Sequence, residues 1–306
     1  MKNKLFDGMI GLIIFLSMIS CLMGILWGVG DGPSVIISYW NTSVTLHGFG
    51  LYQHDSVAIA AQGIAQDYVT LIVAIPMLVL SWSKFKEFSL RGGLILLGTL
   101  GYFLYTYTSY VFLWMLNPMF IVYVMLMSLS FFAFVWAFMQ FDIDRVSHAF
   151  LPKFPNKLIG FVQIALGVLL GGMWLSMIVS YVFSGIPPAG LDHYTTLVIQ
   201  GLDLGFIVPL ALLSGVWILQ RKPMGFMLSA VVIFKGFLMG LAILAMLFAQ
   251  HDAQVTVSLI QWIVFPLLTG AFAVCFWLMF NNMHKTIDIK VYRHALISTP
   301  QEEVTT

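Results

Sequence analysis

Charged residues are scarce in this chain. Asp, Glu, Lys and Arg together make up 9% of its 306 residues, whereas a soluble globular chain carries about 25%. Hydrophobic residues account for 60% of the sequence, and the mean hydropathy is +0.95. Because so few polar groups cannot cover a water-exposed surface, the composition predicts an integral membrane protein in contact with a lipid bilayer.

Cysteine is also rare, and the common catalytic motifs are missing. Cys21 and Cys275 both lie in apolar runs, which excludes a disulfide framework or a thiolate metal cluster within one chain. The sequence has no exposed basic stripe, which argues against a nucleic-acid partner. It has no phosphate-binding loop, no Gly-x-Ser-x-Gly elbow and no His-Glu-x-x-His helix. No histidine lies deep in an apolar run, so paired axial haem ligation inside the bilayer lacks its usual residues.

Apolar runs long enough to cross a membrane occur eight times. A helix needs about 20 residues to span a hydrocarbon core of roughly 30 Å. The runs cover about residues 8–30, 57–81, 92–115, 118–140, 158–184, 195–219, 224–249 and 256–280. We therefore expect an all-α bundle of eight transmembrane helices in a single domain, residues 1–290, followed by a polar cytoplasmic tail, residues 291–306.

The positive charges predict the orientation of this bundle. With eight spans both termini lie on one side, and that side receives every Lys and Arg except Lys235, which falls inside the seventh span. The positive-inside rule then places both termini in the cytoplasm of a cell (inner) membrane. The opposite, outer side carries aspartate and histidine.

Two similar phrases suggest an internal repeat. His54-Asp55 is followed by Gln62-Gly63, and Asp192-His193 is followed by Gln200-Gly201, in each case near the outer entry of a span. A parallel duplication of four plus four spans would produce this arrangement. The rest of the two halves shows little identity, so the duplication and an accidental likeness are equally weighted alternatives.

Histidine and aspartate are paired on the outer side. Three of the four helices that descend from this side are preceded by such a pair: His54-Asp55, Asp192-His193 and His251-Asp252. The aspartates, and Asn117, suit helix N-caps because their side-chain oxygens accept free backbone N–H groups. Imidazole and carboxylate are also metal ligands. These six residues could therefore form a divalent metal site at the outer face, provided that tertiary packing brings them together.

Polar residues also continue into the spans. On helical wheels His193, Thr196, Gln200 and Asp203 share one face, and a second stripe contains Asp55, Gln62 and Gln66, with Asp67 beside it. A carboxylate in hydrocarbon costs about 2.5–3.5 kcal/mol on insertion scales and therefore needs a partner. Lys235 is the candidate partner for Asp203. We interpret Asp67, Asp203, Lys235, Gln62, Gln66 and Gln200 as an intramembrane polar site.

The same seventh span contains a small-residue patch. Gly236 and Gly240 are four residues apart beside Lys235, a spacing that allows a neighbouring helix to approach closely.

These features favour a transporter or permease-like protein for a small solute or cation, with a polar cavity open to the outer face. One alternative is a membrane enzyme or redox protein with an outer His/Asp metal site. A chromophore receptor using Lys235 rests on one residue, and a structural or assembly subunit would use the polar groups only to satisfy one another. The sequence leaves catalytic residues, oligomeric state and enzymatic activity undetermined.

Overall fold

The computed structural model describes residues 3–284 and 291–292. Among these residues, eight helices are long and apolar enough to cross a membrane. They are Lys4–Leu26 (α1), Val57–Lys86 (α2, η2 and α3), Leu90–Phe112 (α4), Phe120–Met139 (α5), Asn156–Ser184 (α7), Val198–Leu219 (α8, η4 and α9), Pro223–Asp252 (α10) and Leu259–Asn281 (α11). Each coincides with a predicted apolar run, which confirms the eight-span, all-helical, multi-pass membrane protein.

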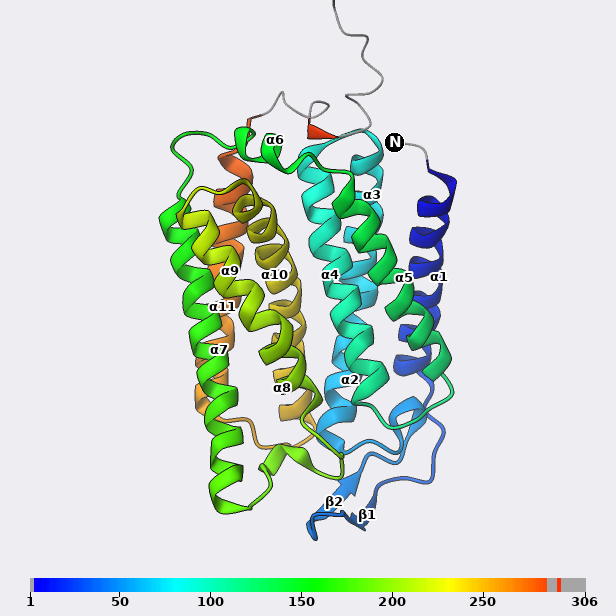
Figure 1. Ribbon diagram of the computed structural model, residues 1–306. Helices are drawn as coiled ribbons and strands as arrows, with labels where there is room; N and C mark the ends of the chain where they lie inside the picture. The colour runs from blue at the N-terminus through cyan, green and yellow to red at the C-terminus, as the bar shows by residue number, and fades with distance from the viewer. Residues whose placement is uncertain (1–2, 285–290, 293–306) are drawn as a thin grey trace, which may run out of the picture.

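The helices form two halves (Figure 1). Helices α1 to α5 lie side by side in one half, and α7 to α11 in the other. In the first half α4 packs against α5 and α3, and α1 packs against α5 and α2. In the second half α7 packs against α9, and α10 against α9 and α11. Helix α10 also packs against α2 and α4, so it joins the two halves.

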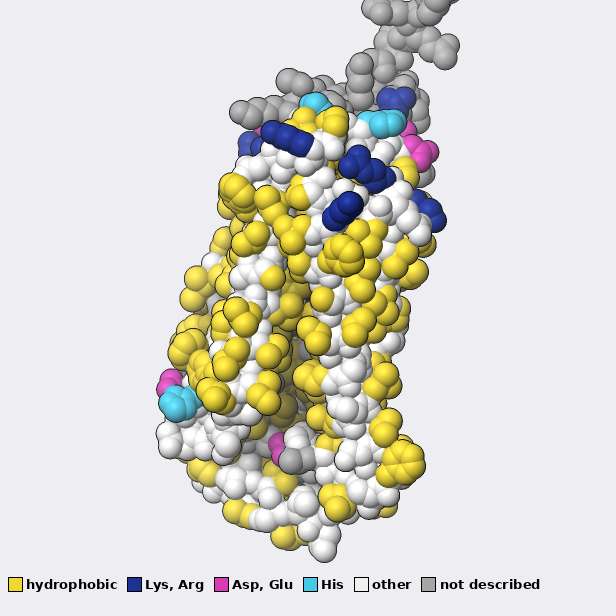
Figure 2. All heavy atoms as spheres, turned by 90° about the vertical axis from the view of Figure 1, so that its left-hand side faces the viewer, with side chains coloured by type: hydrophobic (Ala, Val, Ile, Leu, Met, Phe, Trp, Pro, Cys, Tyr) yellow, Lys and Arg dark blue, Asp and Glu magenta, His cyan; other side chains and the backbone are white. Residues whose placement is uncertain are grey.

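The outside of the bundle is apolar along its length (Figure 2). Large side chains such as Phe161, Leu169 and Val182 are more than 60% exposed. Monomeric soluble proteins rarely expose contiguous apolar surfaces of this extent. The exposed apolar side chains therefore mark the surface that contacts lipid.

Lysine and arginine gather at one end of the bundle (Figure 2). Lys84 and Lys86 lie in the last turn of α3 (Ile75–Lys86), and Arg145 lies in α6 (Ile143–His148), a short helix at the same end. Lys2, Lys285, Lys290 and Arg293 fall outside the described residues. Of the predicted tail, the structure describes Val291 and Tyr292. The Tyr292 hydroxyl donates to the Ser89 carbonyl at 2.8 Å.

Two spans are interrupted by π-helical turns. Span two is α2 (Val57–Val69), η2 (Thr70–Ala74) and α3; span six is α8 (Val198–Leu202), η4 (Asp203–Ile207) and α9 (Val208–Leu219). In both spans the second residue after the π-helical turn is a proline, Pro76 in α3 and Pro209 in α9. Proline has no N–H and its ring clashes with the carbonyl four residues earlier, so the preceding turn widens.

The segment between the first two spans lies at the end of the bundle opposite the lysines and arginines, which we call the outer end, and contains regular structure that the sequence did not predict (Figures 1 and 2). Strands β1 (Ser34–Ile37) and β2 (Ser43–Leu46) form an antiparallel hairpin with Ser34 paired to Leu46. A 3₁₀ turn, η1 (Gly50–Tyr52), follows and buries Tyr52. A second 3₁₀ turn, η3 (Ala189–Leu191), precedes span six. These segments cover the outer end of the bundle.

The helices that begin at the outer end are not capped by the residues that the sequence predicted. Ser56, not Asp55, caps α2 by accepting from the Ile59 amide, and Ser258 caps α11 in a capping box with Gln261. Asp252 is the last residue of α10 instead of the start of the eighth span. A serine hydroxyl accepts the same orphan N–H groups, which leaves Asp55 free for contacts elsewhere.

The small-residue patch of α10 does receive a neighbouring helix. A side chain on Gly236 would collide with the Phe272 ring, and one on Gly240 with Thr269; both of these neighbours belong to α11. This close packing fixes the face of α10 that carries Lys235 relative to the rest of the second half.

Candidate functional site

Asp203 lies at the first residue of η4, where span six widens. Its side chain is 7% exposed and accepts two hydrogen bonds from other spans. The Tyr105 hydroxyl of α4 donates to Oδ1 at 2.7 Å, and the Trp174 Nε1–H of α7 donates to Oδ2 at 2.9 Å. Each carboxylate oxygen therefore has a donor, one from each half of the molecule.

Lys235 is brought to the same place without a direct ion pair. Its Nζ lies 3.8 Å from the centroid of the Tyr105 ring, and the described residues contain no Asp203–Lys235 contact within 4.0 Å. An ammonium over an aromatic face is attracted by the electron density of the ring. Tyr105 thus stands between the two charges and contacts both. We call Asp203, Tyr105, Trp174 and Lys235 the Asp203 cluster.

The predicted stripe above Asp203 is only partly helical. Helix α8 begins at Val198, so the helical wheel does not apply to His193 and Thr196, which precede it. Gln200 is in α8 and partly exposed, and its Nε2 makes a weak contact with the Met177 sulfur at 4.0 Å. Of the predicted stripe in span six, Asp203 is the residue with strong hydrogen bonds.

Asp67 forms a separate cluster in the first half. It is 1% exposed, and the Tyr52 hydroxyl donates to its Oδ2 at 2.6 Å. The Tyr110 hydroxyl lies 3.1 Å from its Oδ1 and 3.1 Å from the Gly63 carbonyl oxygen. We call Asp67, Tyr52 and Tyr110 the Asp67 cluster. The sequence prediction grouped Asp67 with Asp203, whereas the structure gives the two carboxyls different partners.

The glutamines of span two also separate. Gln66 is buried between α2 and α4, where its Nε2 donates to the Tyr102 hydroxyl at 2.7 Å and to Thr106 Oγ1 at 2.9 Å. Thr70, in η2, shares a hydrogen bond of 2.9 Å with the same Tyr102 hydroxyl. Gln62 is partly exposed. The Gln66 network holds the π-helical turn against α4.

A third polar group joins the halves at their outer end. The Tyr194 hydroxyl donates to Asp55 Oδ1 at 2.8 Å and accepts from the Ser56 amide at 3.3 Å. The Met115 amide donates to the same Asp55 oxygen at 3.0 Å, and Trp40 Nε1–H donates to the Tyr194 carbonyl at 3.2 Å. We call this group the outer latch, because Tyr194 belongs to the second half and its partners to the first.

The outer histidines do not converge as the metal hypothesis requires. His193 Nε2 lies 3.0 Å from the His54 carbonyl, to which it must donate, so the contact is with backbone and not with the His54 ring. His251 and Asp252 are exposed at the end of α10, where the His251 ring contacts Trp262. Within the described part of the chain, no group of three or more His, Cys, Asp or Glu side chains is arranged to hold a metal ion.

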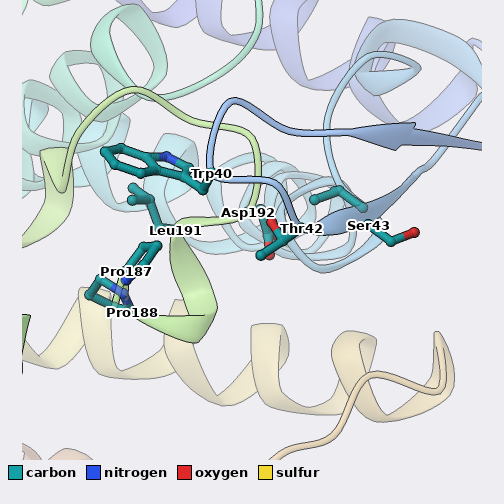
Figure 3. A pocket seen from close by; sticks show the side chains of 8 residues that line it. Trp40, Thr42, Ser43, Pro187, Pro188, Leu191 and Asp192 are labelled. Atoms are coloured by element: carbon teal, nitrogen blue, oxygen red, sulfur yellow. The ribbon is translucent and has the colours of Figure 1, made fainter. Parts of the chain in front are cut away.

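Two hollows flank the outer latch. One, of about 110 Å³, lies between the β1–β2 segment and the loop before α8, with Trp40 and Asp192 among its lining residues (Figure 3). The other, of about 270 Å³, is lined by Tyr39, Trp40, His193, Tyr194 and Thr195. The backbone of Asp192 has φ 51°, an uncommon conformation for a residue with a side chain. Between the two hollows Asp55, Ser56 and Tyr194 remain buried, and their hydrogen bonds connect the halves.

Asp55 gives the outer latch a pH dependence. Burial raises the pKa of Asp55 from 3.8 to about 7, against the opposing effect of the hydrogen bonds from Met115 and Tyr194. The folded protein therefore holds the proton more tightly than the unfolded chain. The stabilisation is complete below pH 4 and is lost as the pH rises through about 7. In this window the free energy of unfolding falls by about 1.4 kcal/mol for each pH unit, so the total change is about 4 kcal/mol.

We expect the wild-type protein to unfold at a lower temperature at pH 8 than at pH 5. Asp55→Asn, which cannot titrate, should lose this difference, and Asp252→Asn is the matched exposed control. Burial lowers the pKa of His193, which works in the opposite sense because that contribution is lost as the pH falls through 6.5. Asp55→Asn should therefore leave a flat or reversed profile. An unchanged profile would show that Asp55 does not control the outer latch.

The structure adds residues that the sequence analysis did not select. Tyr52, Tyr110, Trp174 and Tyr194 hold the carboxylates, but each is distant in sequence from its partner. The available signal was the proline in each of spans two and six, which marks a helix break near each carboxylate. No known family model, curated protein or solved structure matches the chain.

Proposed function

We propose that this protein is a transporter of a small solute or cation, with the Asp203 cluster as its substrate site. One observation carries the proposal: Asp203 and Lys235, both in the second half, are held by one residue of the first half, Tyr105. Ionisable groups inside spans are costly and mark substrate or ion pathways by default. A movement of one half against the other would break both contacts together.

The interrupted helices support the same function. The π-helical turns Thr70–Ala74 and Asp203–Ile207 occupy corresponding spans of the two halves, and each is followed by a proline. Transporters place substrate sites at discontinuous helices between repeated halves. This correspondence also favours the four-plus-four duplication. With the basic end facing the cytoplasm, both termini would be cytoplasmic, in a cell membrane.

The proposed site carries both signs of charge. Asp203 would attract a cationic group of the solute, while Lys235, which is partly exposed, would attract an anionic one. The Trp174 and Tyr105 rings supply apolar surface on either side. A solute that binds must replace hydrogen bonds that the carboxylate already makes, so we expect a polar molecule with a positive charge.

Accessibility from the two sides of the membrane tests the mechanism. A cysteine at Leu104, partly exposed on α4 next to Tyr105, should react with a membrane-impermeant thiol reagent from either side of a vesicle. Val168→Cys is the control, since Val168 is 60% exposed on the apolar surface of α7 and should not react. Labelling of Leu104→Cys from one side only would contradict alternating access.

A panel of solutes then tests the site. Cationic, anionic and zwitterionic solutes are compared for their ability to raise the unfolding temperature of the purified protein and to exchange across proteoliposomes. We expect stabilisation by a positively charged solute in the wild type and at least a tenfold weaker effect in Asp203→Asn. A solute that stabilises both proteins equally binds elsewhere.

A further inference from the structure

The Asp67 carboxyl is enclosed by neutral groups. The titratable side chains that face it are Cys21 on α1, Tyr52 in η1, three tyrosines of α4 (Tyr102, Tyr107 and Tyr110) and Tyr123 on α5. Among the described residues none of the groups facing Asp67 is a cation. An ionised carboxylate without a cationic partner is strongly disfavoured away from water.

The hydrogen bonds around Tyr110 indicate which form of Asp67 is present. The Tyr110 hydroxyl has one hydrogen, but it lies 3.1 Å from two acceptors, the Gly63 carbonyl and Asp67 Oδ1. If Asp67 is protonated on Oδ1, it donates to Tyr110, and Tyr110 donates to the carbonyl. Tyr52 then donates to Oδ2. With this proton each of the two Tyr110 contacts has a hydrogen of its own, whereas without it one hydroxyl hydrogen must serve both acceptors.

Further buried polar atoms lie in the same part of the first half. The hydroxyls of Ser20, Tyr107 and Tyr123 and the Trp114 N–H have no hydrogen-bond partner among the described residues. The three aromatic rings of this group pack around the ring of Tyr110, whose centroid lies 5.7 Å from that of Tyr107, 5.0 Å from that of Tyr123 and 4.4 Å from that of Trp114. Buried polar atoms are almost always bonded to protein or to ordered water. These groups therefore add unused hydrogen-bonding capacity to the buried part of the first half that holds Asp67.

We infer that Asp67 is a proton-binding site in the first half, distinct from the Asp203 cluster in the second, and that it is a neutral carboxylic acid at pH 7. Protonation forms an O–H bond at Asp67 Oδ1 and breaks one O–H bond of a hydronium ion, which becomes water; deprotonation is the reverse step. The short contact with Tyr52 and the dense packing leave a proton as the ion that fits.

Infrared difference spectroscopy tests the proton site without any solute. The spectrum of the wild type minus that of Asp67→Asn should contain the carbonyl stretching band of a protonated carboxylic acid at pH 7. The same band should persist in Asp203→Asn, which serves as the matched control. A difference spectrum with carboxylate bands alone would overturn the inference.

Conservative variants cover the case in which Asp67→Asn does not fold. Tyr52→Phe and Tyr110→Phe keep the rings but remove one hydroxyl each, so they should move the frequency of the protonated carbonyl band. Thr108→Ser, on the same helix as Tyr110, should leave it unchanged, because its hydroxyl bonds the Leu104 carbonyl instead. An unmoved band in both phenylalanine variants would show that the protonated acid is not Asp67.

A role for this proton in transport rests on the proposed function. If the proton is the coupling ion, Asp67→Asn should lose uptake driven by a pH gradient while keeping solute exchange between vesicles without a gradient. If Asp67 is protonated but the protein transports no solute, the proton site is supported and the proposed transport function is wrong. If Asp67→Asn keeps uptake driven by a pH gradient, the Asp67 proton is not the coupling ion, and the other two proposals are unaffected.

Discussion

Gly24→Ala is expected to be one of the most destabilising single substitutions in the protein. A methyl group at this position of α1 would overlap Asp67 Oδ2 and approach the Tyr52 hydroxyl to 3.0 Å. Both neighbours are fully buried, so neither can move away without losing its hydrogen bond. Overpacking costs about 1–3 kcal/mol, and an unpaired buried polar group costs about as much again.

Gly11→Ala is the matched control for this prediction. Gly11 is on the same helix and a methyl group there would meet nothing within 4 Å, so the unfolding temperature should be unchanged or slightly raised. Both proteins would be followed by thermal unfolding in detergent. Equal unfolding temperatures for Gly24→Ala and wild type would mean that α1 does not pack against Asp67 as described.

The spans could be predicted from the sequence because their signal is local. A run of about 20 apolar residues identifies a span wherever its neighbours lie, and all eight predicted runs are helices. The boundaries moved by a few residues where capping decides them. Ser56 starts α2, and α10 continues to Asp252 because no helix-breaking residue follows Ala249.

The partners of the polar residues could not be predicted in the same way. Asp203 was selected from its position in a span, but Tyr105 and Trp174 are 98 and 29 residues away in sequence. Hydropathy and helical wheels describe one helix at a time. The packing of α4 against α10 and α8 decides which tyrosine of α4 faces which carboxylate. The sequence of one helix does not contain that information.

The pairing of aspartate with histidine was misleading for a similar reason. Adjacent residues at a helix entry point in different directions, so one of them can join the core while the other stays in the loop. Asp55 is buried by Tyr194 and Met115, whereas His54 is exposed. The adjacency that suggested a ligand pair instead reflects the place where a loop enters the bundle.

Removing either charge of the Asp203 cluster should destabilise the protein more than removing both. Asp203→Asn leaves the Lys235 ammonium without a carboxylate nearby, and Lys235→Met leaves the carboxylate with neutral donors only. Breaking a direct buried charge pair from one side costs about 3–5 kcal/mol, whereas replacing both charges is often neutral. Asp203 and Lys235 meet through Tyr105 and Lys235 is partly exposed, so each single loss should be smaller than that of a direct pair. We therefore expect the double variant to unfold close to the wild-type temperature.

Tyr105 should transmit this coupling. Tyr105→Phe keeps the ring beneath Lys235 but removes the donor to Asp203 Oδ1, at a cost of about 1.5–3 kcal/mol for a hydrogen bond to a charged group. In Tyr105→Phe, the interaction energy between Asp203→Asn and Lys235→Met should shrink. A double-mutant cycle of unfolding free energies, measured in both backgrounds, gives this difference directly.

The double variant also separates stability from function. If the two charges serve only to neutralise each other, the double variant (Asp203→Asn with Lys235→Met) should behave as wild type in every assay. If they form a substrate site, it should fold normally and yet show no solute-induced rise in unfolding temperature and no solute exchange. Because the double variant is expected to unfold close to the wild-type temperature, a loss of activity in it could not be attributed to misfolding. Additive losses of stability in the cycle would instead show that Asp203 and Lys235 are independent, and Tyr105 would then be a contact of each without coupling them.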